Sequence, residues 1–143
     1  MNGQTLATIH RQSGDKHRIW SASEYNELLD NPLTVLVQDS CSFAIGRLVA
    51  GEAELLMIAV EQEHQRKGIG RHSLNRFEKA LIAKGATCCF LEVAKSNSSA
   101  RALYEGTGFD VVSTRKAYYK IDKRERLDAL IMLKTFSMSS MPC

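Results

Sequence analysis

The segment from Gln65 to Gly70 has the composition of an anion-binding turn. Its two glycines, Gly68 and Gly70, allow backbone angles closed to other residues and let a ligand approach the main chain closely. An apolar run precedes the segment and a helical pattern follows it, so its N–H groups would open a helix and point at an anion. Three basic side chains add positive charge: Arg66, Lys67 and Arg71. From this pattern alone, a phosphate cradle and an ordinary solvated turn are both open alternatives.

A single carboxylate, Glu92, interrupts the apolar stretch 86–94, which is typical of a buried strand. The two-residue period of a strand places its side chain on the same face as Phe90, where an ionised carboxylate is costly unless it has a partner or a task. Glu92 is therefore either a general base for proton transfer or a structural carboxylate, including one at a solvated strand end.

Tyr104 is the second candidate for proton transfer. A phenol titrates near pH ~10, stays protonated at neutral pH and can give its proton to a leaving group. Considered without other residues, Tyr104 is more typical of an aromatic side chain in the core. The neighbouring Glu105 is rotated by about 100° around the predicted helix and is expected to face solvent.

Local patterns predict the elements that would position these residues. The predicted helices rest on apolar spacing and caps, such as the capping box of Ser21 and Glu24, and the strands on β-branched and aromatic runs between turn residues. The helices are expected from the start to about residue 12, at 22–30, from the glycine turn to Gly85, and at 98–105. The strands are expected at 33–37, 43–49, 53–60, 86–94, 109–119 and 127–136.

The order of these elements predicts the fold class. A helical start, antiparallel hairpins, a central parallel βαβ unit and an antiparallel end indicate an α/β protein with a mixed, mostly antiparallel twisted sheet and helices on both faces. The helix at 98–105 also stands between two strands, as in a parallel crossover. With 143 residues, 44% of them apolar, the chain fits a single domain at 1–136 followed by a flexible tail at 137–143.

The charge balance suits a small anionic ligand better than a nucleic acid. Nineteen Lys and Arg against sixteen Asp and Glu give a net charge of +3, which is too mild for a nucleic-acid-binding protein without a clustered basic face. Basic and aromatic residues do alternate in one stretch, but such a run is more typical of a solvated strand edge: Arg115, Lys116, Tyr118 and Tyr119. Nucleic acid is therefore not the expected partner.

Other function classes have little support in the sequence. No apolar stretch is long enough to span a bilayer and no signal-peptide pattern opens the chain, so we expect a cytoplasmic protein with no membrane partner. His64 and His72 lie eight residues apart, unlike the histidines of a zinc helix, and the four cysteines form no ligand cluster. No metal is expected.

The turn fails the patterns of nucleotide P-loops and dinucleotide-binding loops, but it resembles another loop. Gln65 to Gly70 is similar to Gln/Arg-x-x-Gly-x-Gly/Ala, the acyl-coenzyme A pyrophosphate loop of the GCN5-related N-acetyltransferase (GNAT) superfamily. Further segments resemble its RimI branch, bacterial enzymes that acetylate the N-terminal alanine of a small-subunit ribosomal protein. The similarity covers about residues 46 to 133 and is carried by 54–60, 90–93, 96–97, 102–105, 108–109, 115–119 and 128–132.

This resemblance implies a GNAT fold, acetyl-CoA as co-substrate and a role for each candidate residue. Glu92 would be the general base and Tyr104 the general acid for the leaving thiolate. The strand residues Ile58, Ala59 and Val60 would pair with the pantetheine arm and polarise the thioester carbonyl through a backbone N–H. The remaining cofactor-binding residues would be Asn97, where the βαβ unit splays open, and, at the pyrophosphate, Arg66, Lys67, Gly68, Ile69, Gly70 and Arg71. The stretch around Arg115 would belong to the peptide-binding wall.

The predicted function is transfer of an acetyl group from acetyl-CoA to the N-terminal α-amine of a protein, by resemblance a ribosomal protein, through direct attack in a ternary complex. Two alternatives stay open. The acceptor is instead a lysine side chain or a small amine, because the donor half of the site would look the same. Otherwise the chain is a non-catalytic acyl-CoA-binding module, which would keep Gly68 and Gly70 but would not need Glu92 and Tyr104 together.

Overall fold

The structure, a computed structural model, describes residues 2–14, 20–120 and 126–136, and its elements follow the predicted order. The predicted tail at 137–143 lies outside these residues. The helices are α1 (Gly3–Gln12), α2 (Ala22–Asp30), α3 (Ile69–Ala83) and α4 (Ser98–Gly106), with a short 3-10 turn, η1 (Gln62–His64). The strands are β1 (Thr34–Gln38), β2 (Ser42–Val49), β3 (Glu52–Val60), β4 (Cys88–Ala94), β5 (Asp110–Lys120) and β6 (Arg126–Thr135).

The helix starts follow from local side-chain chemistry. Asn2 caps α1 by accepting a hydrogen bond from the Thr5 N–H, and Ser21 and Glu24 form the predicted capping box of α2. α3 differs, because its cap is Gly68 with φ +80°, and no side chain of the described residues caps its first N–H groups. The start of α3 is therefore open to an external acceptor.

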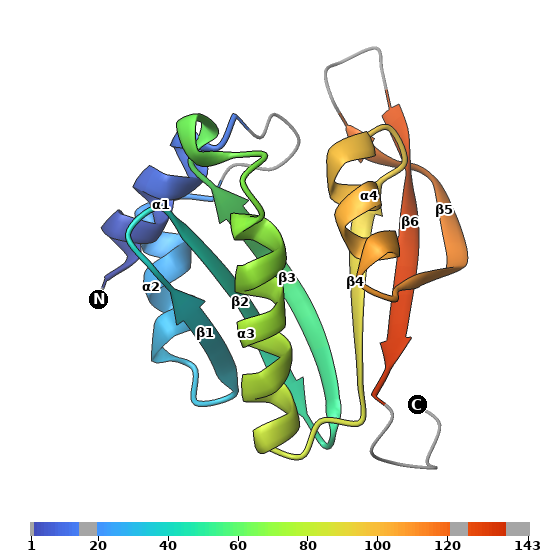
Figure 1. The fold of residues 1–143 in the computed structure, drawn as a ribbon, viewed down its shortest axis with the longest axis horizontal. Coiled ribbons are helices and arrows are strands. Elements are labelled where there is room, and N and C mark those ends of the chain that lie inside the picture. Colours follow the sequence, from blue (N-terminus) through green and yellow to red (C-terminus); the bar gives the residue numbers. More distant parts are fainter. Residues whose placement is uncertain (1, 15–19, 121–125, 137–143) are drawn as a thin grey trace.

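The strands form one mixed sheet in the order β1-β2-β3-β4-β6-β5, as Figure 1 shows. Only the central pair β3 and β4 is parallel, and α3 connects them, which confirms the predicted βαβ unit. The second crossover does not place β5 beside β4, because β6 lies between them and pairs antiparallel with both. Burial explains this order: β6 carries the buried Leu130 and Met132, whereas residues 110–116 of β5 are exposed and suit a sheet edge.

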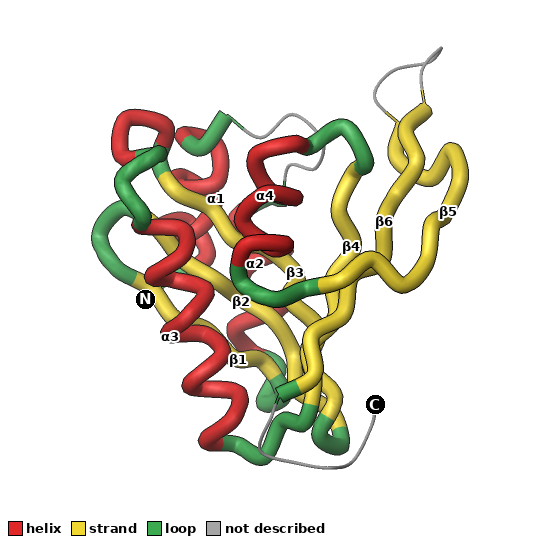
Figure 2. Tube along the Cα trace, turned by 45° about the vertical axis from the view of Figure 1, so that its right-hand side comes forward, coloured by secondary structure: helices red, strands yellow, loops and turns green. Residues whose placement is uncertain are grey.

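Helices cover both faces of the sheet, and each pair has its own core. Side chains of α3 and α4, among them Phe77 and Tyr104, pack with Leu91 and Met132 on one face. Side chains of α1 and α2 pack with Phe43 and Ile45 on the other. Figures 1 and 2 show that α1 and α2 lie behind β1–β3, so no helix of the described residues covers the face of β4, β6 and β5 opposite α4. Among the described residues, no helix is long and apolar enough to cross a membrane.

A bulge in β3 changes which side chains point to each face. Ile45 pairs with Met57 and Gly46 pairs with Leu55, so Leu56 is an extra residue in β3. Leu55 packs with the α3 side, whereas Leu56 and Met57 both pack with the α1 side. Beyond the bulge Ile58 again packs toward α3. The bulge therefore turns the end of β3 just before the glycine turn.

Candidate active site

The glycine turn has the geometry of an anion cradle. Gly68 adopts φ +80°, and a Cβ placed there would meet no atom within 4 Å, so the space beside its backbone is open. The first helical hydrogen bond of α3 runs from the His72 N–H to the Gly68 carbonyl, which leaves the N–H groups of Ile69 and Gly70 without a helical acceptor. No acidic residue lies in this first turn. The partial positive charge of the helix start is therefore unopposed.

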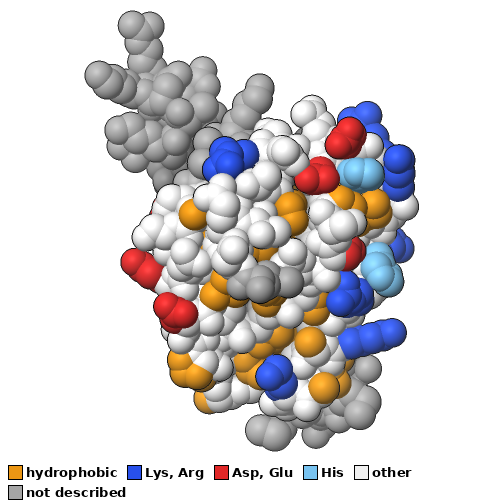
Figure 3. Space-filling model, turned by 90° about the vertical axis from the view of Figure 1, so that its left-hand side faces the viewer, with side chains coloured by type: hydrophobic (Ala, Val, Ile, Leu, Met, Phe, Trp, Pro, Cys, Tyr) orange, Lys and Arg blue, Asp and Glu red, His pale blue; other side chains and the backbone are white. Residues whose placement is uncertain are grey.

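Basic side chains surround this turn, as expected. Arg66, Lys67 and Arg71 are all exposed, and Arg66 itself adopts a left-handed backbone with φ +64°. Figure 3, viewed from the β1 side, shows Lys, Arg and His side chains along the margin where α3 lies. The Arg71 guanidinium, however, lies against the end of α4, where a Cβ added to Gly106 would be 3.0 Å from its Nη2 atom. Arg71 thus links the start of α3 to the end of α4.

The end of β3 offers a free backbone edge. Pairing between β3 and β4 stops at Glu54 and Phe90, although β3 runs on to Val60 and β4 to Ala94. Figure 1 shows the two strands diverging toward the glycine turn. Ile58, Ala59 and Val60 are paired with β2 on one side only. Their other edge is available to an extended ligand such as a pantetheine arm.

Asn97 is the N-cap residue of α4. Its Oδ1 atom caps the helix by accepting a hydrogen bond from the Ala100 N–H at 3.3 Å. The residue lies just beyond the end of β4, on the opposite side of the diverging strands from Val60. The cap holds Asn97 in place through its Oδ1 atom.

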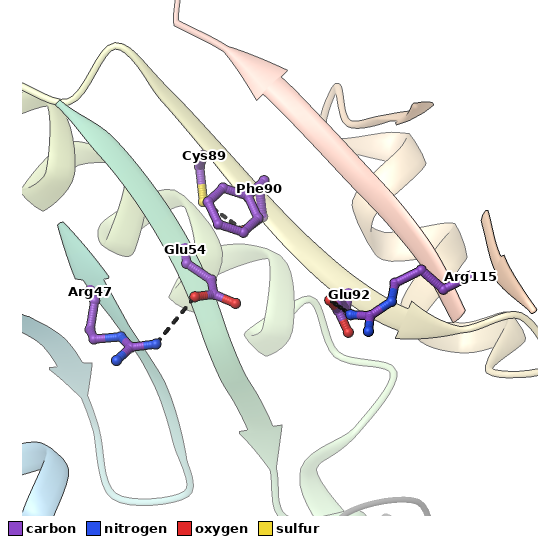
Figure 4. A network of polar contacts seen from close by, with 6 residues as sticks. All are labelled: Arg47, Glu54, Cys89, Phe90, Glu92 and Arg115. Carbon is purple, nitrogen blue, oxygen red and sulfur yellow. Dashed lines mark hydrogen bonds and ion pairs between the residues drawn. The ribbon is translucent and has the colours of Figure 1, made fainter. Parts of the chain in front are cut away.

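Glu92 lies on the sheet face opposite α3 and α4. Leu91 and Val93, its neighbours in β4, point into the core beneath those helices, so the alternating Glu92 points the other way. Its side chain is 25% exposed, and its Oε1 atom accepts a hydrogen bond of 2.7 Å from Arg115 Nη1 on β5. Figure 4 shows the side chains of Glu92 and Arg115 lying against each other beside β4.

Tyr104 lies on the helix side of the same strand. It is 7% exposed, belongs to the core that contains Leu91 and Val93, and packs edge-on against Phe109 at a centroid distance of 5.8 Å. Glu92 and Tyr104 therefore lie on opposite faces of β4. The strand period predicted the face of Glu92, but nothing local to Tyr104 revealed its side.

Two groups of hydrogen bonds hold the glycine turn and α3 in place, and the sequence did not predict either of them. The Gln65 amide donates to the Val60 carbonyl at 2.9 Å and to the Ser13 carbonyl at 2.8 Å, which ties the turn to β3 and to the end of α1. The Ser73 hydroxyl of α3 lies 2.9 Å from that of Ser42, which donates to Asp39 at 2.7 Å. The run Asp39 to Ser42 had the composition of a turn with its own side-chain hydrogen bonds, which is the signal available in the sequence.

The pKa values of Asp39 and Cys89 are shifted in opposite directions. Burial by itself raises the pKa of Asp39, but hydrogen bonds from the Ser42 side chain and from the Cys41 and Ser42 backbone, with the Arg76 charge, bring it below the ordinary value. Among the described residues Cys41 and Cys89 have free thiols. Burial raises the pKa of the Cys89 thiol to about 12, so it is not a thiolate nucleophile at neutral pH.

One other polar cluster lies at the end of β3. Glu61, Glu63 and His64 bring potential ligand atoms within 4.8 Å of one another, and Glu61 and Glu63 also line a cavity of about 540 Å³ with Gln12 and Gln62. Glu63 is exposed and Glu61 and His64 are partly buried, and acidic groups at a protein surface commonly lie together in this way without an ion. The cavity lies beside the turn and is not lined by Glu92 or Tyr104.

Comparisons with known proteins agree with this geometry. Residues 8–109 match the acetyltransferase (GNAT) family. Ribosomal protein bS18-alanine N-acetyltransferase of Escherichia coli strain K12 is 43% identical over 98 residues, 68% of this chain and 65% of that protein. The Haemophilus influenzae protein of the same name is 32% identical over 128 residues, 90% of this chain and 79% of that one. The crystal structure of the Escherichia coli ribosomal-protein-S18-alanine N-acetyltransferase superposes with a TM-score of 0.84 at 30% identity, over 99% of this chain and 92% of that chain.

The diverging parallel strands, the open helix start and the glycine turn define an α/β protein with an anion-binding turn between a strand and a helix. The chain belongs to the acetyltransferase (GNAT) family. The predicted family and fold are thereby confirmed. The sequence match with the Escherichia coli relative spans 65% of that protein, less than two thirds of its length.

Proposed function

We propose that this protein transfers an acetyl group from acetyl-CoA to the N-terminal α-amine of a protein. The observation that carries the proposal is the free edge of Ile58–Val60 leading directly into the uncapped start of α3. This arrangement provides a backbone ladder for the pantetheine arm and N–H donors for the pyrophosphate, in the order that they occur in acetyl-CoA. The open space beside Gly68 fits the close approach of a phosphate group.

The position of Glu92 supports an acceptor side opposite the donor side. The glycine turn and α3 would hold acetyl-CoA on one face of the sheet, whereas Glu92 faces the other. An amine reaching the gap between β3 and β4 from that face would lose its proton to Glu92 as its nitrogen attacks the thioester carbonyl carbon. A backbone N–H of Ile58–Val60 would stabilise the oxygen that becomes negative.

Tyr104 completes the proton balance from the donor side. As the carbon–sulfur bond breaks, the phenol would give its proton to the coenzyme A thiolate. The two proton-transfer groups then serve opposite ends of the same reaction, which suits their positions on opposite faces of β4. Direct attack on the thioester is consistent with the two free thiols among the described residues, because burial raises the pKa of both Cys41 and Cys89 and neither is a ready nucleophile at neutral pH.

The relatives named above support a protein N-terminus as the acceptor, and a ribosomal protein as the substrate to test first. Three peptides test it with the purified protein and acetyl-CoA: one starting with a free alanine amine and lacking lysine, the same peptide with a blocked N-terminus, and a blocked peptide with one lysine. Release of coenzyme A thiol is followed in each case. Turnover of the free N-terminus alone is expected.

Other outcomes select the alternatives. Turnover of the blocked lysine peptide alone would replace the N-terminal assignment by lysine acetylation. Binding of acetyl-CoA by calorimetry without turnover of any amine would leave a non-catalytic acyl-CoA-binding module. We also propose that the protein works in the cytoplasm, needs no metal, and forms one domain from residue 1 to 136.

A further inference from the structure

The partner of Glu92 does not come from a neighbouring strand. Arg115 is on β5 and Glu92 is on β4, with β6 between them. Arg115 pairs in register with Ala129, and Glu92 pairs with Ile131. The Arg115 side chain must therefore cross β6 over a small residue, Ala129, which is fully buried. Ile131 offers no polar atom of its own, so Glu92 receives its hydrogen bond from a strand away.

A second arginine–glutamate pair on the same face shows what is unusual in this arrangement. Arg47 and Glu54 lie directly opposite each other on β2 and β3, and their 3.4 Å contact is an ordinary cross-strand pair. The pair of Arg115 and Glu92 is shorter, at 2.7 Å, although Arg115 has farther to reach. Both pairs are partly exposed, so neither contributes much to stability. Figure 4 shows both pairs in one view, with Arg47 and Glu54 at β2 and β3 and with Glu92 at β4 beside Arg115.

The contact uses one oxygen of the carboxylate. Arg115 Nη1 donates to Oε1, and no described residue donates to Oε2. A charge-assisted hydrogen bond on one oxygen restricts rotation of the carboxylate and leaves the second oxygen as the acceptor for an incoming proton. The Arg47–Glu54 pair also engages one carboxylate oxygen, Oε1 of Glu54, but at the longer distance of 3.4 Å.

We propose that Arg115 is a positioning residue that holds Glu92 in the orientation needed to take the proton from the acceptor amine. The inference rests on the proposed function, because it assigns Arg115 a role through Glu92 and not through its own contact with a substrate. Misplacing a catalytic group by about 1 Å costs on the order of 100-fold in rate. Loss of Arg115 is therefore expected to lower kcat and to leave ground-state binding of both substrates nearly intact.

The test compares Arg115→Ala with Arg47→Ala, which breaks the Arg47–Glu54 pair on the same sheet face. Steady-state kinetics with the free-alanine peptide should show kcat reduced by about 10- to 100-fold for Arg115→Ala, with peptide KM within about twofold. Arg47→Ala should match wild type. Arg115→Lys keeps a cation that can reach Oε1 and should recover most of the rate. Calorimetry should give wild-type acetyl-CoA affinity for all three, which also shows that they are folded.

A double variant isolates the route of the effect. Glu92→Gln with Arg115→Ala should be no slower than Glu92→Gln alone, because Arg115 would act through Glu92. Additive losses, or a raised peptide KM with unchanged kcat, would mean that Arg115 contacts the substrate and would overturn the proposal. So would a wild-type rate for Arg115→Ala. If the wild-type protein turns over no amine, the proposed function fails and the inference fails with it. If the wild-type protein is active and Arg115→Ala is equally active, only the inference about Arg115 fails.

Discussion

Two regions of this molecule are assembled in different ways. The donor segment, residues 58–71, is continuous: the end of β3, η1, the glycine turn and the first residues of α3 follow one another in the chain. The proposed proton-transfer group consists of Glu92 and Tyr104, with Arg115 as the positioning partner of Glu92; these residues come from β4, α4 and β5 and lie on two faces of the sheet. The binding site of an extended ligand can come from one continuous segment of the chain. Groups that transfer protons must instead surround the reacting atoms, so they can come from separate elements.

This difference separates the expected effects of mutations. Side-chain changes in the donor segment should alter acetyl-CoA affinity, because its proposed contact with the reacting atoms is a backbone N–H and its other contacts are to the unreactive parts of acetyl-CoA. Changes in the proton-transfer group should alter turnover, because its interactions matter most in the transition state. Variants that mix the two effects would contradict the division.

The largest effect is expected for Glu92→Gln. The amide keeps the shape of the carboxylate but cannot take a proton, so kcat should fall by between about 10²- and 10⁴-fold while acetyl-CoA affinity is unchanged. Stopped-time thiol-release assays and calorimetry measure the two quantities. Glu54→Gln changes a carboxylate of similar exposure on the same sheet face and should keep the wild-type rate. A full rate for Glu92→Gln would remove Glu92 from the mechanism.

The next largest effect is expected for Gly68→Val, and it should appear in acetyl-CoA affinity and not in turnover. A branched side chain at φ +80° is strained and would fill the open space beside the turn, so the Kd for acetyl-CoA should rise by about 10- to 100-fold. Gly85→Val is the matched control, because Gly85 at the end of α3 has φ +93° and equally open surroundings. Both variants should lose similar thermal stability. Equal losses of acetyl-CoA affinity in the two would show that strain, not ligand contact, is responsible.

Tyr104→Phe should have a smaller effect on turnover. A thiol has a pKa of about 8.5, so its thiolate leaves readily and needs less help from an acid than an alkoxide would; kcat should fall by about 10-fold. The ring contact with Phe109 is kept, which preserves packing. Tyr25→Phe removes a buried hydroxyl that lies 2.8 Å from His10 Nδ1 and should lower the melting temperature without changing kcat per folded molecule. The opposite pattern in the two variants would contradict an acid role for Tyr104.

The smallest expected effect concerns the support of the donor segment. Asp39 has a pKa below its ordinary value in the folded protein, so its charge adds stability above the unfolded pKa of about 3.9, and this stability is lost as the pH falls through the folded pKa. Asp39→Asn should therefore lower the unfolding free energy by at most about 1 kcal/mol at pH 7, after allowance for screening by solvent. Denaturant titrations from pH 7 to acid should show the gap between variant and wild type closing. A constant gap would assign the loss to packing and not to charge.

The accuracy of the sequence predictions follows the same division. The capping box of Ser21, the helix after the glycine turn and the strand leading into it were predicted within a few residues, because caps, periodicity and glycine angles are local properties. The bulge at Leu56 was not predicted, since a continuously apolar strand shows no change of phase. The place of β6 between β4 and β5 was also missed, because pairing of distant strands is decided by burial across the whole sheet.

The sequence by itself determined the family, the order of the elements and the donor segment, because each depends on residues close together in the chain. It also indicated that Glu92 shares a face with Phe90, through the two-residue period of a strand. Only the tertiary structure decided that Tyr104 lies on the opposite face of β4 and that Arg115 crosses β6 to reach Glu92. Those relations depend on how helices cover the sheet and which strands are neighbours, and the free energy that sets them is the burial of side chains brought together from the whole chain.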